Sequence, residues 1–113
     1  MNKTLNLEIG SVVDGRYQVV KFSGDFDKAG HSEIKDQLSA CVDHFQAESL
    51  LFDFSKLKFI NSEGIGVLVE IDAHLVKRGK KLIIIGPNAH VADVFQAVGL
   101  KEIMPIFDNI SAF

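Results

Sequence analysis

The sequence predicts an α/β fold with a mixed, mostly parallel sheet of about five strands, an N-terminal antiparallel hairpin, and helices packed mainly on one face. Three observations lead to this prediction. Strand-like alternation fills the first segment, helical periodicity begins near residue 28, and short apolar runs then alternate with further helical segments. Strands separated by helices of this length run parallel and are joined by right-handed crossovers.

The chain opens with a predicted hairpin. Residues 5–9 alternate between apolar and polar side chains, as in a half-buried strand. Asp14 and Gly15 supply the turn, because glycine adopts positive φ without cost. A second strand covers residues 16–22 and ends in the segment 23–25.

A helix over residues 28–45 follows, with one apolar face formed by Ile34, Leu38, Cys41, Val42 and Phe45. Cys41 is the only cysteine, which excludes an internal disulfide and a cysteine-based zinc site. Its place on this face indicates a small buried hydrophobe rather than a catalytic thiol.

The rest of the chain alternates between strands and helices. Residues 50–54 are predicted as a strand covered on both faces, and residues 55–60 as a connection. A helix over 62–77, stopped by Gly79, would bury Ile65, Leu68, Val69, Ile71, Leu75 and Val76. The remaining predictions are a strand over 81–85, a helix capped by Asn88 that presents Val91, Val94, Phe95 and Val98 and ends at Gly99, and an edge strand over 103–107 containing Pro105.

Composition excludes several classes of protein. The chain of 113 residues is predicted to form one domain, residues 1–113, and its 12 Lys+Arg against 15 Asp+Glu give a formal charge of −3. Nucleic-acid binding by phosphate neutralisation needs a basic stripe, and membrane insertion needs about 20 consecutive apolar residues. The sequence has neither, and no signal-peptide core follows residues 1–4, so a cytoplasmic protein is predicted.

The candidate site lies where predicted strands end and helices begin, in segments 23–27 and 59–66. A serine at a helix start is most often an N-cap, but Asn61 is an equally good cap, which would leave the Ser62 hydroxyl free to point outward. An exposed hydroxyl there is a candidate phosphorylation site. A phosphate adds about −1.5 to −2 charge, which the helix amino end partly stabilises.

Two glycines follow Ser62 in the first turns of the same predicted helix. Glycine within a helix costs about 0.5–1 kcal/mol relative to alanine, so Gly64 and Gly66 need an explanation. Close packing on the sheet would explain at least one of them. A bare first turn that lets a partner approach the backbone is the functional interpretation, and both interpretations can hold together.

Catalytic and metal-binding patterns are weak. Gly64-Ile65-Gly66 lacks the further glycine or Gly-Lys-Ser/Thr of a phosphate loop, and Ile60 rules out a Gly-x-Ser-x-Gly elbow around Ser62. The histidines are interpreted as solvated surface residues; they are His31, His44, His74 and His90. Asp25 and Asp53 alone do not form a closed ligand set for a cation. We therefore predict no enzyme activity, no cofactor and no metal site.

Five segments in order carry a resemblance to a known family: 24–27, 51–54, 59–67, 86–88 and 94–100. Together they resemble the STAS domain, specifically the bacterial anti-sigma factor antagonist family, over nearly the whole chain. The resemblance implies a protein that binds an anti-sigma factor, itself a serine kinase of the histidine-kinase-like ATPase fold, and thereby frees a sigma factor. Phosphorylation at the start of the second helix ends binding, and a serine phosphatase restores it.

The resemblance places the phosphoacceptor at Ser62 and the partner contacts at Asp25, Asn61, Ser62, Glu63, Gly64 and Gly66. The sequence departs from the family pattern on both sides of Ser62. Asn61 stands where the family usually has Asp, which keeps the cap but loses a charge. Glu63 stands where the family usually has Ser or Thr, and its carboxylate repels an incoming phosphate.

The sequence leaves two alternative functions to compare with this one. Other standalone STAS domains are accessory subunits of ABC-type lipid-transport complexes, in which case the chain would bind an ATPase constitutively and Ser62 would be only a cap. A small enzyme or nucleotide-binding protein has little support in the sequence. The identity of the partner kinase and sigma factor, the process controlled, and self-association stay open.

Overall fold

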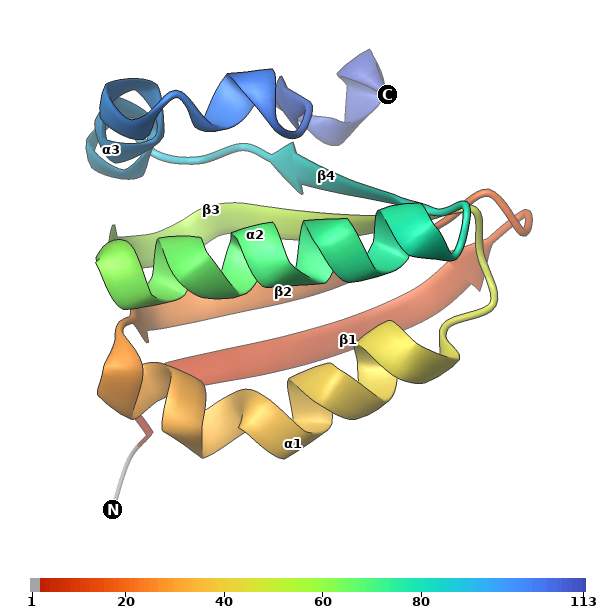
Figure 1. The fold of residues 1–113 in the computed structure, drawn as a ribbon, viewed down its shortest axis with the longest axis horizontal. Helices are drawn as coiled ribbons and strands as arrows, with labels where there is room; N and C mark the ends of the chain where they lie inside the picture. Colours follow the sequence, from red (N-terminus) through yellow and green to blue (C-terminus); the bar gives the residue numbers. More distant parts are fainter. Residues whose placement is uncertain (1–2) are drawn as a thin grey trace.

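The computed structural model describes residues 3–113, which form a five-stranded sheet and three α-helices (Figure 1). In chain order the elements are β1 (Leu5–Val13), β2 (Tyr17–Phe26), α1 (Lys28–His44), β3 (Ser49–Ile60), α2 (Ser62–Lys77), β4 (Lys81–Ile85), α3 (Ala89–Val98) and β5 (Ile106–Phe107). The strand order is β1-β2-β3-β4-β5, with β1 antiparallel to β2 and every other pair parallel. The predicted fold class is confirmed.

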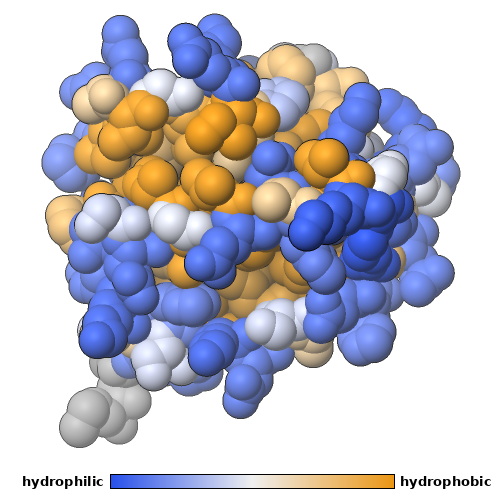
Figure 2. Space-filling model, viewed as in Figure 1, coloured by the Kyte–Doolittle hydropathy of each residue, from blue (hydrophilic) through white to orange (hydrophobic). Residues whose placement is uncertain are grey.

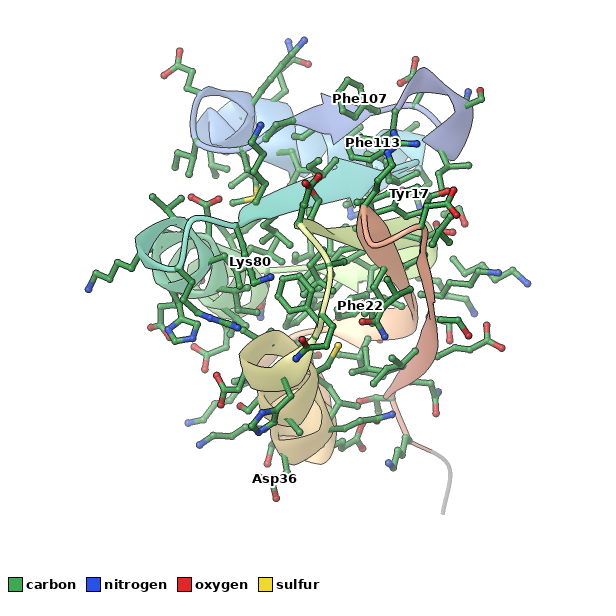
Figure 3. The ribbon with its side chains drawn as sticks, turned by 90° about the vertical axis from the view of Figure 1, so that its right-hand side faces the viewer. Tyr17, Phe22, Asp36, Lys80, Phe107 and Phe113 are labelled. Atoms are coloured by element: carbon green, nitrogen blue, oxygen red, sulfur yellow. The ribbon has the colours of Figure 1, made fainter. Side chains whose placement is uncertain are left out.

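The sequential strand order explains where the helices lie. Each parallel connection moves one strand onward in the same direction, and right-handed crossovers then put every helix on the same face of the sheet. The main core forms between this face and the helices; it contains Phe22, Phe52 and Phe54 from the strands and Leu68 and Phe95 from the helices. Figure 3 shows Phe22 inside the molecule and Asp36 of α1 pointing away from it.

The other face of the sheet carries a smaller apolar cluster of Leu51, Ile83 and Ile85. The C-terminal segment covers part of it, since the Phe113 ring lies 5.5 Å from the ring of Tyr17 and 6.3 Å from that of Phe107 (Figure 3). No described helix combines the length and the apolarity that crossing a bilayer requires.

Strand lengths differ from the prediction. The connection predicted over 55–60 is wrong, because β3 continues to Ile60, and β2 continues through 23–25 to Phe26. Register shifts between Lys21 and Ser23 and between Gly24 and Asp25 disturb the alternation of buried and exposed residues, which hid the strand from pattern reading. The predicted strand 103–107 shortens to Ile106–Phe107, and it is an edge strand as expected.

Burial also differs at a few predicted core positions. Val76 is 62% exposed and Val98 is 53% exposed, because each lies on a side of its helix that faces solvent. Cys41 is half-buried, and this burial raises the pKa of its thiol. The other three histidines are exposed, but His31 is half-buried, with its ring 6.2 Å from that of Phe26.

A carboxylate ties the start of β1 to α1. Oε1 of Glu33 accepts hydrogen bonds from the Thr4 hydroxyl at 2.9 Å, from the Thr4 N–H at 2.8 Å and from the Leu5 N–H at 3.1 Å. The hydroxyl bond, helped by the two backbone bonds, lowers the pKa of the Glu33 carboxyl.

We expect Glu33→Gln to lower stability near neutral pH and to flatten the acid limb of the stability curve. The folded-state pKa of Glu33 is depressed, so its contribution is present above the unfolded value of about 4.3 and is lost as pH falls through the folded value. Urea unfolding at about pH 7 and about pH 3 checks this. The difference between wild type and variant should shrink at acid pH, whereas Glu48→Gln, at an exposed residue of the α1–β3 loop, should show no such change.

Candidate functional site

Three helices begin at the same edge of the sheet, where β2, β3 and β4 end (Figure 1, left). Each starts after an Asp or Asn whose side chain caps its first turn: Asp27 for α1, Asn61 for α2 and Asn88 for α3. Carboxyl ends of parallel strands are where α/β proteins place their functional groups. The two segments that the sequence singled out, 23–27 and 59–66, both lie at this edge.

At the start of α2 the capping role and the exposed hydroxyl belong to different residues. Oδ1 of Asn61 accepts hydrogen bonds from the N–H of Glu63 at 3.1 Å and of Gly64 at 3.2 Å. Ser62 is the first helical residue and is exposed. The expectation that Asn61 caps the helix is confirmed, and Ser62 beside it is exposed and is not the cap.

Gly64 holds the first turn of α2 against the end of β2. A Cβ at this position would lie 2.4 Å from the carbonyl oxygen of Phe26 and 2.7 Å from Cγ1 of Ile60, so only glycine fits. The Asn61 N–H also donates to the Phe26 oxygen, at 3.4 Å. A Cβ on Gly66 would meet nothing within 4 Å. Gly64 is therefore required by packing, while Gly66 leaves an uncovered patch of backbone.

Asp25 lies at the end of β2, half-buried, where its N–H donates to the carbonyl oxygen of Thr4 at 2.8 Å. Asp53 of β3 pairs with Lys21, which is four residues before Asp25 on β2, and the Oδ1 of Asp53 accepts a hydrogen bond from the Ser55 N–H. The two carboxylates do not converge. Among the residues that the structure describes, no three His, Cys, Asp or Glu side chains are grouped to hold a metal ion.

Sequence reasoning missed an aromatic pair at this edge. Phe59, the residue before the end of β3, is 40% exposed and stacks on His90 of α3, with ring centroids 6.3 Å apart and an interplanar angle of 18°. The nearby Asn88 side chain also donates from Nδ2 to the Leu57 carbonyl oxygen at 2.7 Å, which joins α3 to β3. The sequence signal for this pair is Phe59, an apolar residue within the segment 55–60 that the sequence predicts as a connection.

The family model of the STAS domain matches residues 9–112. The chain belongs to the STAS domain family.

Among curated relatives, the chain is similar to the anti-sigma F factor antagonist of Paenibacillus polymyxa, with 26% identity over 105 residues, which cover 93% of this chain and 90% of the relative. Among solved structures it resembles an anti-sigma factor antagonist from Mycobacterium paratuberculosis, with a TM-score of 0.82 and 19% identity, covering 96% of this chain and 89% of that one. It also resembles the anti-sigma factor antagonist SpoIIAA in its unphosphorylated form, with a TM-score of 0.71 and 22% identity. The match covers 89% of this chain and 87% of that one. These structural likenesses show the fold.

The division of roles between Asn61 and Ser62 predicts unequal effects of alanine substitution. Asn61→Ala removes the acceptor for two backbone N–H groups and should destabilise the protein by about 0.5–2 kcal/mol. Ser62→Ala should change stability by less than about 0.5 kcal/mol, because Ser62 is exposed and the cap is intact. Urea unfolding of the two variants measures both, and a larger loss for Ser62→Ala than for Asn61→Ala would mean that Ser62 is itself the cap.

The two glycines of α2 should respond in opposite directions to alanine. Gly64→Ala forces a methyl group against the Phe26 carbonyl and should cost about 1–3 kcal/mol. Gly66→Ala meets open space and should stabilise the helix by about 0.5–1 kcal/mol. Thermal unfolding followed by circular dichroism compares the pair, and a loss of stability in Gly66→Ala would contradict the open surface.

Proposed function

We propose that this protein is an anti-sigma factor antagonist, a non-enzymatic binding protein that holds an anti-sigma factor in the cytoplasm and so releases a sigma factor. The observation that carries the proposal is the exposed Ser62 hydroxyl at the start of a helix whose cap is supplied by Asn61. Family membership and the named function of the relatives support it.

The partner is a serine kinase of the histidine-kinase-like ATPase fold that phosphorylates Ser62, and a serine phosphatase reverses the reaction. A solved relative in phosphorylated form supports a phosphorylation switch on this fold. In this chain the phosphate would project from the surface, because the Glu63 and Gly64 N–H groups are already bound to Asn61. The new charge of about −1.5 to −2 would meet the partner while the domain's own hydrogen bonds stay in place.

The proposed contact surface is centred on Ser62. Glu63 and Gly66 are exposed beside it, and Asn61 is half-buried at the helix start. Asp25 lies at the end of the neighbouring strand, and Phe26, which follows it, joins the two segments through its bond to Asn61. Gly64 belongs to the predicted contact set, but it is buried, so we assign it the role of setting the height of the helix above the sheet.

The alternative function, an accessory subunit of an ABC-type lipid-transport complex, has less support. The curated relatives with anti-sigma F and anti-sigma-B antagonist names favour the antagonist function. Constitutive binding to an ATPase would also leave the accessible Ser62 hydroxyl without a role.

Affinity capture from source-cell lysate, with wild type and Ser62→Ala as baits, tests this function. We expect both baits to retain an anti-sigma factor, and we expect intact-mass analysis of native protein to find a phosphoryl group that Ser62→Ala lacks. Purified Ser62→Asp should bind the recovered factor at least about tenfold more weakly, a difference of about 1.4 kcal/mol.

Ser32→Asp is the matched control, because Ser32 is an exposed serine in α1. It should bind like wild type. Recovery of an ABC-type ATPase with both baits, or full binding by Ser62→Asp, would contradict the proposed function.

A further inference from the structure

β1 borders the sheet on one side (Figure 1), and no other strand of residues 3–113 pairs with its outer edge. In an antiparallel pair, successive residues direct their N–H and C=O groups alternately toward the paired strand and away from it. The Asp25 N–H donates to the carbonyl oxygen of Thr4, in register with the β1–β2 ladder. The backbone groups of Leu7 and Ile9 therefore point away from β2, in an order that another strand can satisfy.

The start of this outer edge is already closed. Leu5 points its N–H to the same outer side, and Oε1 of Glu33 accepts that N–H at 3.1 Å. Beyond Ile9 the β1–β2 register shifts, and the Gly10 carbonyl oxygen accepts a hydrogen bond from Nε2 of Gln18 at 2.7 Å. The open part of the edge is therefore short and lies around the middle of β1.

Apolar side chains gather at this open part. Ile9 is 38% exposed and Val12 is 39% exposed. Ile9 pairs with Val20, which belongs to the main core, so Ile9 lies on the helix-covered face of the sheet. The register shift places Val12 opposite Gln18, two residues from Val20, so Val12 lies on the same face as Ile9. Exposed apolar side chains beside unpaired strand groups are typical of an edge that associates with another chain.

The side of α1 that faces this edge carries a row of exposed polar and small residues. Glu33 identifies that side, because its carboxylate reaches the outer N–H of Leu5. Gln37, Ala40 and His44 follow Glu33 at helical spacing and are exposed as well. Figure 2 shows mostly hydrophilic side chains over α1, in the lower part of the view. The row thus has a carboxylate at one end and an imidazole at the other.

We propose that two copies of this chain associate by pairing their β1 strands antiparallel about a two-fold axis, which joins the two sheets into one. The axis runs the two α1 rows in opposite directions, so the Glu33 end of each row meets the His44 end of the other. This charge complementarity selects a second copy as the occupant. Pairing of β1 with β5 of another copy is disfavoured, because β5 contains only Ile106–Phe107 and would leave most of the edge open.

The charges near the edge also select the register of the pairing. An axis at Leu7 would set Ile9 of one copy against the N–H that Glu33 already holds in the other. An axis at Glu8 would set two carboxylates directly opposite each other, which is destabilising. An axis at Ile9 lets the two Ile9 residues exchange a pair of hydrogen bonds and sets Glu8 against Gly10. The axis is therefore at Ile9.

Sedimentation velocity of the purified chain over a concentration series tests the pairing. Wild type should pass from monomer to dimer as its concentration rises. Ile9→Lys should raise the dissociation constant at least about tenfold, because it brings two like charges together at the axis. Its fold should be retained, since Ile9 is partly exposed at a sheet edge, and circular dichroism checks this. Val98→Lys, at a 53% exposed valine of α3, is the matched control and should dimerise like wild type.

A second pair of variants tests the contact between the two α1 rows. His44→Glu sets an acid near Glu33 of the other copy and should also weaken the dimer. Lys35→Glu is the control, because Lys35 is an exposed residue of α1 that lines the groove between α1 and α2 instead. It should dimerise like wild type. Equal weakening by both variants would mean that net charge, and not this contact, controls association, and would overturn the α1 contact.

Hydrogen exchange followed by NMR locates the pairing on the strand. The Ile9 amide should be protected only at concentrations where the dimer forms, whereas the Glu8 amide, which points toward β2, should be protected in monomer and dimer alike. A chain that stays monomeric up to its solubility limit would overturn the proposal. A dimer that Ile9→Lys does not weaken, or in which the Ile9 amide exchanges freely, would also overturn it. These measurements need only this chain, so they can fail while the proposed function of Ser62 stands.

Discussion

The close approach of Gly64 to the carbonyl oxygen of Phe26 sets the geometry on which the rest of the site depends. A side chain there would lie 2.4 Å from that oxygen, so the first turn of α2 rests directly on the end of β2. The Asn61 N–H binds the same oxygen, which fixes the residue that caps the helix. The position of Ser62 therefore follows from backbone packing, and a change to its hydroxyl leaves that packing untouched.

Much of this arrangement could be predicted from the sequence, because it depends on local physical rules. Alternating periodicities gave the order of elements, and right-handed crossovers gave the face on which the helices lie. Competition between two adjacent capping residues predicted that Ser62 could be free, and Asn61 is indeed the cap. The two glycines near the start of α2 are visible in the sequence, but the sequence does not distinguish their roles. The three-dimensional contacts show that Gly64 has no room for a Cβ, whereas Gly66 has room for one.

The features that the sequence does not predict depend on contacts between residues far apart in the chain. The sequence predicts a connection in place of the second half of β3, because the bulged pairing of β3 with β2 places Lys58 and Phe59 consecutively on exposed positions and so breaks the period of two. The sequence pattern places Val76 and Val98 in the core, because an amphipathic pattern identifies apolar positions but does not show whether another element covers them. Both valines are exposed, so α2 and α3 each keep an apolar side chain that the domain does not bury.

Glu63 is the residue that most complicates a phosphorylation switch, and its place on the helix resolves the difficulty. Successive residues of an α-helix are about 100° apart, so the Glu63 side chain points in a different direction from that of Ser62. A partner centred on Ser62 would meet a neutral hydroxyl at position 62, with the Glu63 carboxylate at the edge of the contact, where water still reaches it. Phosphorylation would put charge at the centre of the contact, where removing water from an unpaired charge costs several kcal/mol. Each 1.4 kcal/mol is about tenfold in affinity, so one phosphate can weaken binding by two or more orders of magnitude even though an acidic residue is already adjacent.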